Sequence, residues 1–443
     1  MEVAIISIGV LGGGLSGLTL AYLLDQQGMS FEIYEKDEVC GGLMRTFQED
    51  GFTFDCGGSH IIFSRDQQVL DFMLGILGNN KVVKRRNAKI LFKGCYVKYP
   101  FENDLAALPS TEKFECLYYF IQNLIEKEKG KLKKPTTLKE WCYYTFGKGI
   151  AENYLIPYNE KIWKYPSEKT SLDWVERIPN PPMEDIVKSS IGISTEGYTH
   201  QLNCYYHEVG GIQKITDYFE NKLEQHINRQ FEVKKLTKRG NNWVISDGER
   251  EREHKKIVST IPVNRLVNAL DAPKAVTNAA KDLKYNSLIV VMLGLNSSKV
   301  NDLTWLYIPD KSILAHRLSF PSNYSSFVTP HGKSSVLAEV TCTIGSNIWE
   351  MKDEEIINQV ISDLHDLNII NKDKVCFAKA VRTEYAYVIN DLNHKKNIRL
   401  ILDFLKKNGI ESVGRFAEFE YLNMDACIRH VFNFVAQKAT FFD

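Results

Sequence analysis

The 443-residue sequence has no excess of charge of either sign and no pairing pattern among its cysteines. Its 55 Lys and Arg residues balance 55 Asp and Glu residues, so the formal net charge is zero. We therefore do not expect the basic surface that general nucleic-acid binding requires. The nine cysteines are an odd number without a Cys-x-x-Cys pair, which disfavours a disulfide framework and indicates the reduced thiols of a cytoplasmic protein.

Several catalytic motifs are also missing. Gly332-Lys333-Ser334 resembles the end of a phosphate-binding P-loop, but such a loop needs a glycine at position 327, where the chain has Phe327. No Gly-x-Ser-x-Gly elbow is present. His200 and His207 have six residues between them, with no cysteine or carboxylate arranged as a partner at metal spacing. The sequence thus gives no support to a kinase, a serine hydrolase or a metal site.

One uncharged run, residues 3–24, is long enough to imitate a membrane span. Five glycines interrupt it, no Lys or Arg precedes it, and no small-residue cleavage pattern follows it. We therefore expect neither a membrane helix nor a secretion signal. With 44% apolar and 25% charged residues, the chain has the composition of a globular protein, and its length predicts two or three domains.

The run begins instead like a dinucleotide-binding βαβ unit. Residues 3–8 are apolar and largely β-branched, which predicts a buried strand; 15–27 predict a helix that ends at Gly28, and 31–35 predict a second strand. Gly12-Gly13-Gly14-Leu15-Ser16-Gly17 lies between the first strand and the helix. Glycines there allow the backbone to approach a pyrophosphate at the helix start. Glu35, 18 residues beyond Gly17, is placed to accept both hydroxyls of an adenosine ribose.

The rest of the chain does not keep a regular alternation of strand and helix. Residues 114–134 predict an amphipathic helix with a charged end, and Asp247-Gly248 predicts a hairpin. Residues 257–261 and 288–295 predict strands of two different sheets. We expect an α/β protein in which a Rossmann-like dinucleotide-binding domain is interrupted by a helical domain and an antiparallel β-sheet substrate domain. The expected ranges are 1–80, 205–275 and 388–443 for the dinucleotide-binding domain, 104–170 for the helical domain, and 81–103, 171–204 and 276–387 for the substrate domain.

A second glycine turn favours FAD over NAD. Cys40-Gly41-Gly42-Leu43-Met44-Arg45 follows the βαβ unit, and Gly57-Gly58-Ser59-His60 follows soon after. This stretch resembles the flavin-binding start of the amine oxidase and protoporphyrinogen oxidase superfamily, which implies that the Rossmann-like domain is an FAD-binding domain.

Within that superfamily the motifs resemble those of the eukaryotic-type UDP-galactopyranose mutases along nearly the whole chain. The matching segments are Gly57-Gly58-Ser59-His60, Tyr99-Pro100-Phe101-Glu102, Tyr158-Asn159-Glu160-Lys161-Ile162-Trp163, Trp174-Val175-Glu176-Arg177, Ala386-Tyr387, Gly414-Arg415 to Tyr421, and Asn423-Met424-Asp425. Tyr307, Arg317 and Tyr324 keep the family's spacing of ten and then seven residues. The ordered set is far more specific than any one of its members.

The resemblance implies a reaction and a set of site residues. The family interconverts the pyranose and furanose forms of a nucleotide sugar through a covalent adduct between the sugar and N5 of reduced FAD, without net redox change. NAD(P)H is the implied reductant, and a UDP-hexose is the implied partner. The implied catalytic residues are His60, Arg177, Arg317 and Arg415. Substrate contacts are implied at Tyr99, Phe101, Glu102, Asn159, Trp163, Gln201, Tyr307, Tyr324, Tyr387 and Tyr421. The glycine motifs and the resemblance together place cofactor contacts at Gly12, Gly14, Leu15, Ser16, Gly17, Glu35, Lys36, Gly42, Leu43, Arg45, Gly58, Ser59, His60, Val233, Gly414, Arg415, Asn423 and Asp425.

Three positions depart from the family pattern. Glu102 stands where the family has glutamine, Gln201 stands where it has asparagine, and the segment 423–425 is shorter. An ionised carboxylate only accepts hydrogen bonds, whereas an amide also donates, so Glu102 leaves the nucleotide base open.

Two other functions stay open at this point. One is an amine oxidase or protoporphyrinogen oxidase-like oxidoreductase, whose pocket would be mostly apolar. The other is a protein that binds FAD and a nucleotide sugar without turnover. The sequence sets no oligomeric state.

Overall fold

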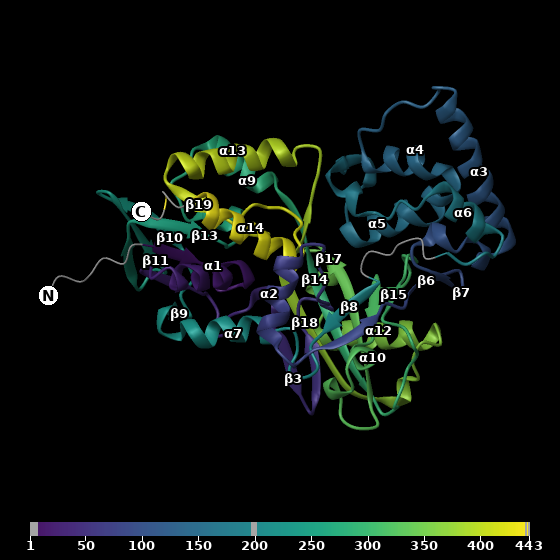
Figure 1. Cartoon of the computed structure of the whole chain (residues 1–443), viewed down its shortest axis with the longest axis horizontal. Coiled ribbons are helices and arrows are strands. Elements are labelled where there is room, and N and C mark those ends of the chain that lie inside the picture. The colour runs from purple at the N-terminus through teal and green to yellow at the C-terminus, as the bar shows by residue number, and fades with distance from the viewer. Residues whose placement is uncertain (1–7, 196–201, 439–440, 442–443) are drawn as a thin grey trace.

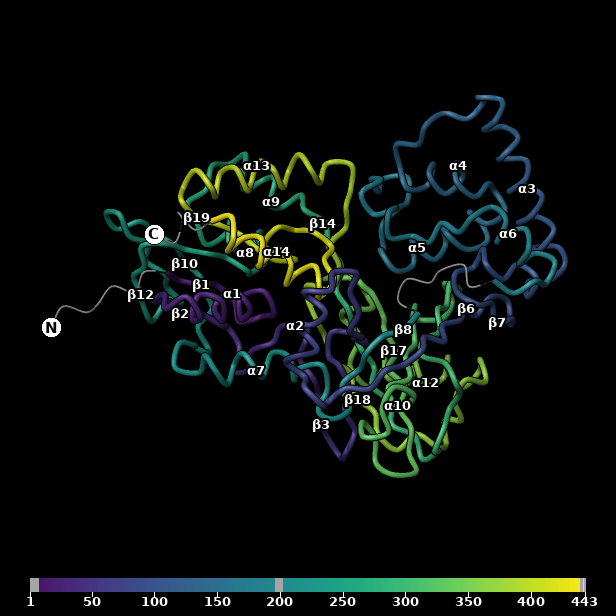
Figure 2. The backbone as a smooth tube through the Cα atoms, in the orientation of Figure 1, coloured from purple at the N-terminus to yellow at the C-terminus, as the bar shows by residue number. Residues whose placement is uncertain are grey.

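The computed structural model describes residues 8–195, 202–438 and 441. Three regions are visible in Figure 1: a region around a small parallel sheet, a region around a broad twisted sheet, and a cluster of helices beside the broad sheet. Figure 2 shows that the chain passes between these regions several times. The expected fold class is confirmed. The expected domain boundaries stay a prediction.

The parallel sheet contains five strands in the order β19-β13-β1-β2-β9. Its strands are β1 Ile8–Leu11, β2 Phe31–Tyr34, β9 Ile227–Asn228, β13 Lys256–Ser259 and β19 Ile410–Ser412. β1 lies in the middle and is wholly buried. Residues 3–7 of the strand predicted at 3–8 lie outside the described residues, while the helix and second strand of the βαβ unit are confirmed as α1 Leu15–Gln26 and β2.

Alternate residues of β1 serve two hydrophobic cores. Ile8 and Val10 pack with α1, α2 Gln67–Leu77, α7 Lys214–Leu223 and α14 Met424–Gln437. Leu11 packs in the opposite core. That core includes α8 Val263–Asn268, α9 Lys274–Asp282, α13 His394–Lys407 and the antiparallel strands β10 Lys235–Arg239 and β11 Asn242–Ser246. β12 Glu251–His254 pairs with β11. The turn between β11 and β12 confirms the hairpin predicted at Asp247-Gly248.

The broad sheet has seven strands in the order β18-β14-β17-β16-β15-β6-β7 and is antiparallel except between β15 and β6. The strands are β6 Ala88–Phe92, β7 Cys95–Lys98, β14 Lys284–Leu295, β15 Trp305–Tyr307, β16 Arg317–Ser319, β17 Ser334–Cys342 and β18 Val375–Ile389. β13 and β14 confirm that 257–261 and 288–295 contribute to different sheets. α12 Asp353–Asp366 packs on one face. The opposite face packs against the hairpin of β3 Thr46–Glu49 and β4 Phe52–Asp55.

The helical cluster contains α3 Ser110–Glu128, α4 Leu138–Ile150, α5 Ile156–Trp163 and α6 Met183–Ser190. The bounds predicted for α3, 114–134, are wrong at both ends. The helix begins directly after Pro109, and it ends before Gly130, whose φ of 64° breaks the helical backbone. A π-helical turn, Ala151–Leu155, joins α4 to α5, and such turns often occur where a helix contributes to a site.

The remaining short elements connect these regions. They are the strand pair β5 Val82–Arg85 and β8 Asn203–Tyr206, the helices α10 Pro321–Tyr324 and α11 Asn347–Glu350, and the 3-10 turns at Gly42–Met44, Phe101–Asn103, Leu105–Ala107, Ser167–Lys169, Leu172–Arg177, Glu224–His226, Ser326–Val328 and Lys372–Lys374. No helix in the described ranges has both the length and the apolar content needed to cross a bilayer.

Lys161 anchors α5 to the broad sheet. Its side chain is buried, and its Nζ donates to the backbone carbonyls of Ile308 (2.8 Å), Asp310 (2.6 Å) and Ala315 (2.8 Å). These carbonyls belong to the chain between β15 and β16. The contact therefore fixes the helical cluster against the strands that carry Tyr307 and Arg317.

Replacement of this anchor tests its structural role. Lys161→Met removes the donor of three backbone carbonyls, those of Ile308 and Ala315 being buried, and we expect the free energy of unfolding to fall by about 2–4 kcal/mol. Lys311→Met removes an exposed lysine whose partner, Glu160, lies 3.4 Å away, and should change stability by about 0.5 kcal/mol or less. Urea unfolding of both variants measures the difference. Equal stability of the two variants would contradict the role of Lys161.

Candidate functional site

A single cavity of about 1430 Å³ extends between the parallel sheet, the broad sheet and the helical cluster. One end is lined by the turn between β1 and α1, and the other by Arg86, Tyr99 and Tyr307. Pockets for one small ligand usually measure about 300–1000 Å³. The cavity is therefore large enough for a dinucleotide and a second ligand together.

Two glycines of the β1–α1 turn, Gly14 and Gly17, have different structural roles. A Cβ at Gly17 would lie 1.9 Å from the carbonyl oxygen of Gly12, so Gly17 permits the close packing of helix and strand. A Cβ at Gly14 would meet nothing within 4 Å. Gly14 also precedes α1 without any side-chain cap, which leaves the first amides of the helix for an anion.

The second glycine turn lies directly against the first. Gly41 N–H donates to the Gly13 carbonyl over 2.9 Å, and Gly14 pairs with Gly41 as an isolated bridge. Both turns line the cavity, and Gly41 and Gly42 have positive φ angles of 108° and 54°. The backbone of both turns can therefore approach one extended ligand.

Glu35 lies at the end of β2 and is held by backbone amides. Its Oε2 accepts from Gly13 N–H (2.8 Å) and its Oε1 from Asp37 N–H (3.0 Å). Each oxygen keeps a second acceptor position, as a pair of ribose hydroxyls requires. Arg45 lies 2.7 Å from Asp37 and 3.8 Å from Glu35. The uncapped helix start, the open space at Gly14 and this carboxylate together fit the ADP half of FAD.

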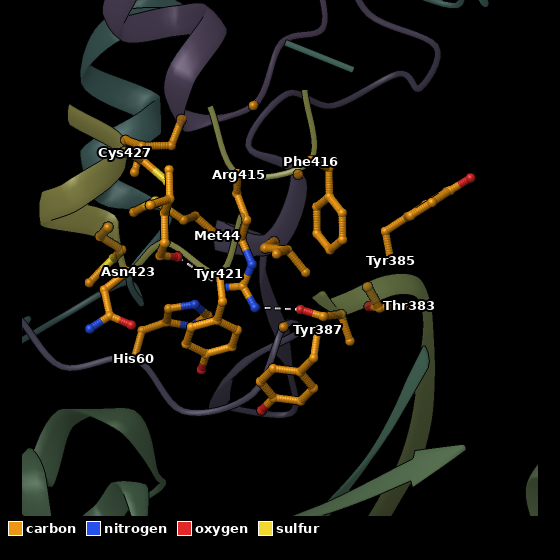
Figure 3. Close-up of a pocket in the computed structure, with 18 of the residues that line it drawn as sticks. Met44, His60, Thr383, Tyr385, Tyr387, Arg415, Phe416, Tyr421, Asn423 and Cys427 are labelled. Carbon is orange, nitrogen blue, oxygen red and sulfur yellow. Dashed lines mark hydrogen bonds between the residues drawn. The ribbon is translucent and has the colours of Figure 1, made fainter. Parts of the chain in front are cut away.

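Farther along the cavity, buried polar atoms without a hydrogen-bond partner in the described chain gather on two loops. They are Ser59 Oγ and His60 Nδ1 after β4, and Arg415 Nε after β19. Figure 3 shows His60, Tyr421 and Asn423 to one side of Arg415, with Tyr387 below it. Such atoms fit the polar edge of a flavin ring, because buried polar groups are normally hydrogen-bonded.

Arg415 is fixed from both sides. Its Nη1 donates to the Leu422 carbonyl (3.1 Å) and its Nη2 to the Ala386 carbonyl (2.5 Å). The guanidinium lies 4.4 Å from the centre of the Tyr421 ring, and Tyr421 stacks on Tyr387 at 5.7 Å. This places one charged and two aromatic groups on the same side of the cavity.

His60 is neutral at neutral pH because burial lowers its pKa to about 4. Its loop is held by Asp55, which accepts from the backbone N–H groups of His60 (3.3 Å) and Ile212 (3.2 Å). Burial raises the pKa of Asp55 to about 7. Sequence reasoning missed Asp55, although an acidic residue at the end of an apolar strand, Phe52–Asp55, was a usable signal.

Arg317 is paired with a residue that sequence reasoning also missed. Its Nε and Nη2 donate to Glu339 over 2.9 and 2.7 Å, and Glu339 is wholly buried. Glu339 also accepts from Tyr387 Oη (3.3 Å) and Ser59 N–H (3.4 Å). A single carboxylate within the otherwise uncharged strand 334–342 was the signal that could have found it.

Arg177 has neutral partners instead. It donates to Asn423 Oδ1 (3.2 Å) and to the Tyr421 carbonyl, and burial lowers its pKa. Because no carboxylate is among these partners, Arg177 can interact with an anion in the cavity without first breaking an ion pair.

Arg86 is a further arginine of the cavity lining and is not among the predicted residues. It lies 4.7 Å from the Tyr99 ring and 5.0 Å from the Trp305 ring, and donates to Tyr307 Oη over 2.8 Å. Tyr154 and Tyr158, which stack at 5.3 Å, were also not among the predicted residues and line the same end. Arg86 directly follows β5, where sequence reasoning had no motif to use.

Most of the predicted site residues line this one cavity. They are Gly12, Gly14, Leu15, Ser16, Glu35, Lys36, Gly42, Leu43, Arg45, Ser59, His60, Tyr99, Glu102, Asn159, Arg177, Val233, Tyr307, Arg317, Tyr387, Arg415, Tyr421, Asn423 and Asp425. The structure thus brings together residues from several distant parts of the sequence. Their roles stay predictions.

Six predicted residues lie behind the lining. Phe101 stacks on Tyr154 at 4.8 Å, and Tyr324 stacks on Tyr206 at 4.7 Å. Trp163 donates through Nε1 to Asn159 Oδ1 (3.1 Å) and packs edge-on against Tyr387 and Tyr421. The other three are Gly17, Gly58 and Gly414, and Gln201 lies outside the described residues.

Glu102 lines the cavity but has only 1% of its surface exposed. Burial raises its pKa to about 8, so the carboxyl is mainly neutral at neutral pH. No group of three or more His, Cys, Asp or Glu residues in the described chain is arranged to hold a metal ion.

A substitution that fills the open space at Gly14 tests whether this end of the cavity binds the pyrophosphate of FAD. Gly14 has φ −81° and ψ −175°, a conformation that valine adopts readily. We expect Gly14→Val to fold with unchanged apo-protein Tm and to weaken FAD binding at least about tenfold, because its methyl groups enter the pyrophosphate position. Flavin absorbance of the purified protein and FAD titration measure this. Full FAD occupancy in the variant would contradict the assignment.

Comparison with known proteins gives both the fold and the family. The crystal structure of a reduced UDP-galactopyranose mutase superposes with a TM-score of 0.89, covering 98% of this chain and 96% of that chain at 24% identity. A putative protoporphyrinogen oxidase from Exiguobacterium superposes with a TM-score of 0.78, covering 98% and 99% at 17% identity. The expected resemblance to the mutases is therefore confirmed at the level of the fold.

One sequence relative matches this chain over a short stretch. An inactive all-trans-retinol 13,14-reductase of Danio rerio is 36% identical over 73 residues, which are 16% of this chain and 12% of that protein. The match thus spans about an eighth of that relative's length. In contrast, the sequence profile of flavin containing amine oxidoreductases matches residues 15–385. The chain belongs to the flavin-containing amine oxidoreductase family.

Proposed function

We propose that this flavoprotein is a nucleotide-sugar mutase that interconverts pyranose and furanose forms, with reduced FAD and no net oxidation. The main support for this proposal is the lining of the cavity beyond the proposed flavin edge, which contains Arg86, Arg177 and Arg317 together with tyrosine hydroxyls. Arginine and tyrosine donors suit a diphosphate attached to a polyhydroxylated sugar. Because one similar solved structure is that of a UDP-galactopyranose mutase, UDP-galactopyranose is the first candidate substrate.

The three arginines can interact with the diphosphate in different ways. Arg317 is oriented by Glu339, which also neutralises most of its charge, so it acts mainly as a directed donor through its remaining N–H groups. Arg177 has neutral partners and keeps its charge for the departing diphosphate. Arg86, held by Tyr307, supplies a second cation at the distal end.

The flavin end supplies the reactive group and its surroundings. Bound reduced FAD would supply a nucleophilic ring nitrogen. Neutral His60 adds no charge beside it, and its unpartnered Nδ1 is available to the ring edge. Arg415, held by two carbonyls, is fixed before any ligand binds. Trp163 holds the Asn159 amide in place from behind, which leaves Asn159 as an oriented part of the sugar site.

The main alternative is an oxidoreductase that oxidises an amine, a porphyrinogen or a polyene. The family and the reductase and oxidase names among the similar proteins favour it. The arginines in the substrate part of the cavity disfavour a polyene, because an apolar substrate would leave the half-buried Arg177 beside a ligand that cannot accept its hydrogen bonds. A protein that binds FAD and a nucleotide sugar without turnover is the third candidate.

We further propose NAD(P)H as the reductant and the cytoplasm as the compartment. All nine cysteines are free, as in proteins of reducing compartments.

The reaction itself is the first test. Protein reduced anaerobically with dithionite is incubated with UDP-, dTDP- and GDP-hexoses, and NMR detects furanose products. We expect a furanose from at least one UDP-hexose with reduced protein and none with oxidised protein. Bleaching of the oxidised flavin by an amine or polyene, with no sugar rearrangement, would support the oxidoreductase instead. Binding without either reaction would support the third candidate.

Removal of Arg177 tests the proposed electrostatic interaction between its guanidinium and the diphosphate. A hydrogen bond to a charged partner contributes about 1.5–3 kcal/mol, so Arg177→Met should lower kcat/KM about ten- to a hundredfold. FAD content should not change. Arg399→Met, on an arginine that is 85% exposed on α13, is the matched control and should keep full activity. An unchanged kcat/KM in Arg177→Met would remove this residue from the site.

A further inference from the structure

We infer that Glu102 reads the nucleotide base as a neutral carboxylic acid, so that uracil is recognised at neutral pH and recognition is lost as the pH becomes alkaline. This inference rests on the proposed function and concerns the same cavity. The sequence alone leaves the identity of the nucleotide base at this position open.

The position of Glu102 first sets its environment. The residue lies in the 3-10 turn Phe101–Asn103, directly after Tyr99 and Pro100, and it lines the cavity. It is almost fully buried, and its Oε1 has no hydrogen-bond partner in the described part of the chain. A buried carboxyl oxygen that borders a cavity and lacks a partner is ready for a ligand atom.

The groups around Glu102 do not stabilise a negative charge. α4 contributes the Cys142 thiol and the π-helical turn contributes the Tyr154 phenol. Burial raises the pKa of both groups, and the nearby Glu102 raises both further, so neither offers a positive charge to the carboxyl. α6 contributes Ser189, whose hydroxyl donates to the backbone carbonyl of Glu102 rather than to its carboxyl. On the neighbouring strand β7, the Lys98 ammonium donates to the Thr195 carbonyl.

The nearest carboxyl group in the sequence, that of Asp104, also forms its hydrogen bond away from Glu102. Asp104 accepts from the Lys98 backbone N–H over 2.8 Å, and its pKa is raised by burial. Burial dominates at Glu102 as well and raises its pKa to about 8, whereas a hydrogen bond from its own backbone N–H lowers it by less. Its proton is therefore held through neutral pH and is lost as the pH rises through about 8.

A neutral carboxyl group presents an O–H donor beside a C=O acceptor. The imide edge of uracil presents the complementary pair, an N–H donor beside a carbonyl acceptor. A glutamine amide offers the same two functions, so a protonated glutamate can replace it. An ionised glutamate offers acceptors alone and suits an edge with two donors, such as that of guanine.

Aromatic rings and arginines complete the proposed nucleotide site. The Tyr99 ring lies 4.9 Å from the Tyr307 ring and 4.7 Å from the Arg86 guanidinium. Tyr154 and Tyr158 line the same end of the cavity. A planar base at Glu102 would thus have ring faces beside it, and the arginines lie where phosphates would follow.

The test measures nucleotide binding rather than turnover. UDP is titrated calorimetrically into the FAD-loaded wild-type protein and into Glu102→Gln from about pH 6.5 to about pH 9. Glutamine keeps the shape, the donor and the acceptor but has no proton to lose. We expect the Kd of the wild-type protein to rise about tenfold more than that of Glu102→Gln between about pH 7 and about pH 9. Loss of the imide proton of uracil itself affects both proteins equally and cancels in this comparison.

Titrations with GDP, together with the UDP titrations of the two proteins, distinguish failure of this inference from failure of the proposed function. Equal pH dependence of UDP binding in both proteins would overturn the role of the proton on Glu102 while leaving the proposed function intact. GDP binding that tightens with pH in the wild-type protein alone would overturn the choice of uracil. Absence of UDP binding to both proteins at every pH would overturn the proposed function and this inference together.

Discussion

The wholly buried carboxylate of Glu339 fixes the relative positions of three segments that meet at the cavity. It lies on β17, near the middle of the broad sheet, and receives hydrogen bonds from Arg317 on β16, Tyr387 on β18 and the backbone of Ser59. A buried charge is tolerated only when its partners are well placed, so the strands, the histidine loop and the arginine must adopt this arrangement together. A Cβ at Gly58, which has a φ of 90°, would lie 3.0 Å from a Glu339 oxygen, so the loop approaches this closely only with glycine.

This pairing also gives a reason for more than one arginine in the proposed substrate part of the cavity. Arg317 alone would bring little net charge, because Glu339 forms two hydrogen bonds with it. Arg177 lies on another segment and donates to an amide oxygen and a backbone carbonyl, while Arg86 donates to a phenol. The cavity therefore combines one preoriented donor with further cations that can attract an anionic ligand.

The sequence predicts local features of the fold better than it predicts long-range contacts. Gly12 to Gly17 and Glu35 form one continuous βαβ unit, so their spacing alone indicates the dinucleotide site. Glu339 and Arg317 belong to different strands, and Ser59 is 280 residues away from Glu339, so no local pattern links them. Arg86 depends in the same way on Tyr307, 221 residues later.

Some residues that the sequence predicts as substrate contacts do not line the cavity: Phe101, Trp163 and Tyr324. They support the lining from behind, and a sequence motif does not distinguish such a residue from one on the cavity surface. The protonation state of Glu102 follows from its burial, which its sequence neighbours do not reveal.

In the proposed reaction, the bond between the sugar and the diphosphate breaks and re-forms in the reduced protein. Positional isotope exchange tests this step most directly, with UDP-galactose that carries heavy oxygen in the bridge between the anomeric carbon and the diphosphate. We predict that the label moves into non-bridging phosphate positions with reduced protein and stays in the bridge with oxidised protein. A label that remains in the bridge in reduced protein, although the nucleotide sugar is bound, would contradict the mutase reaction.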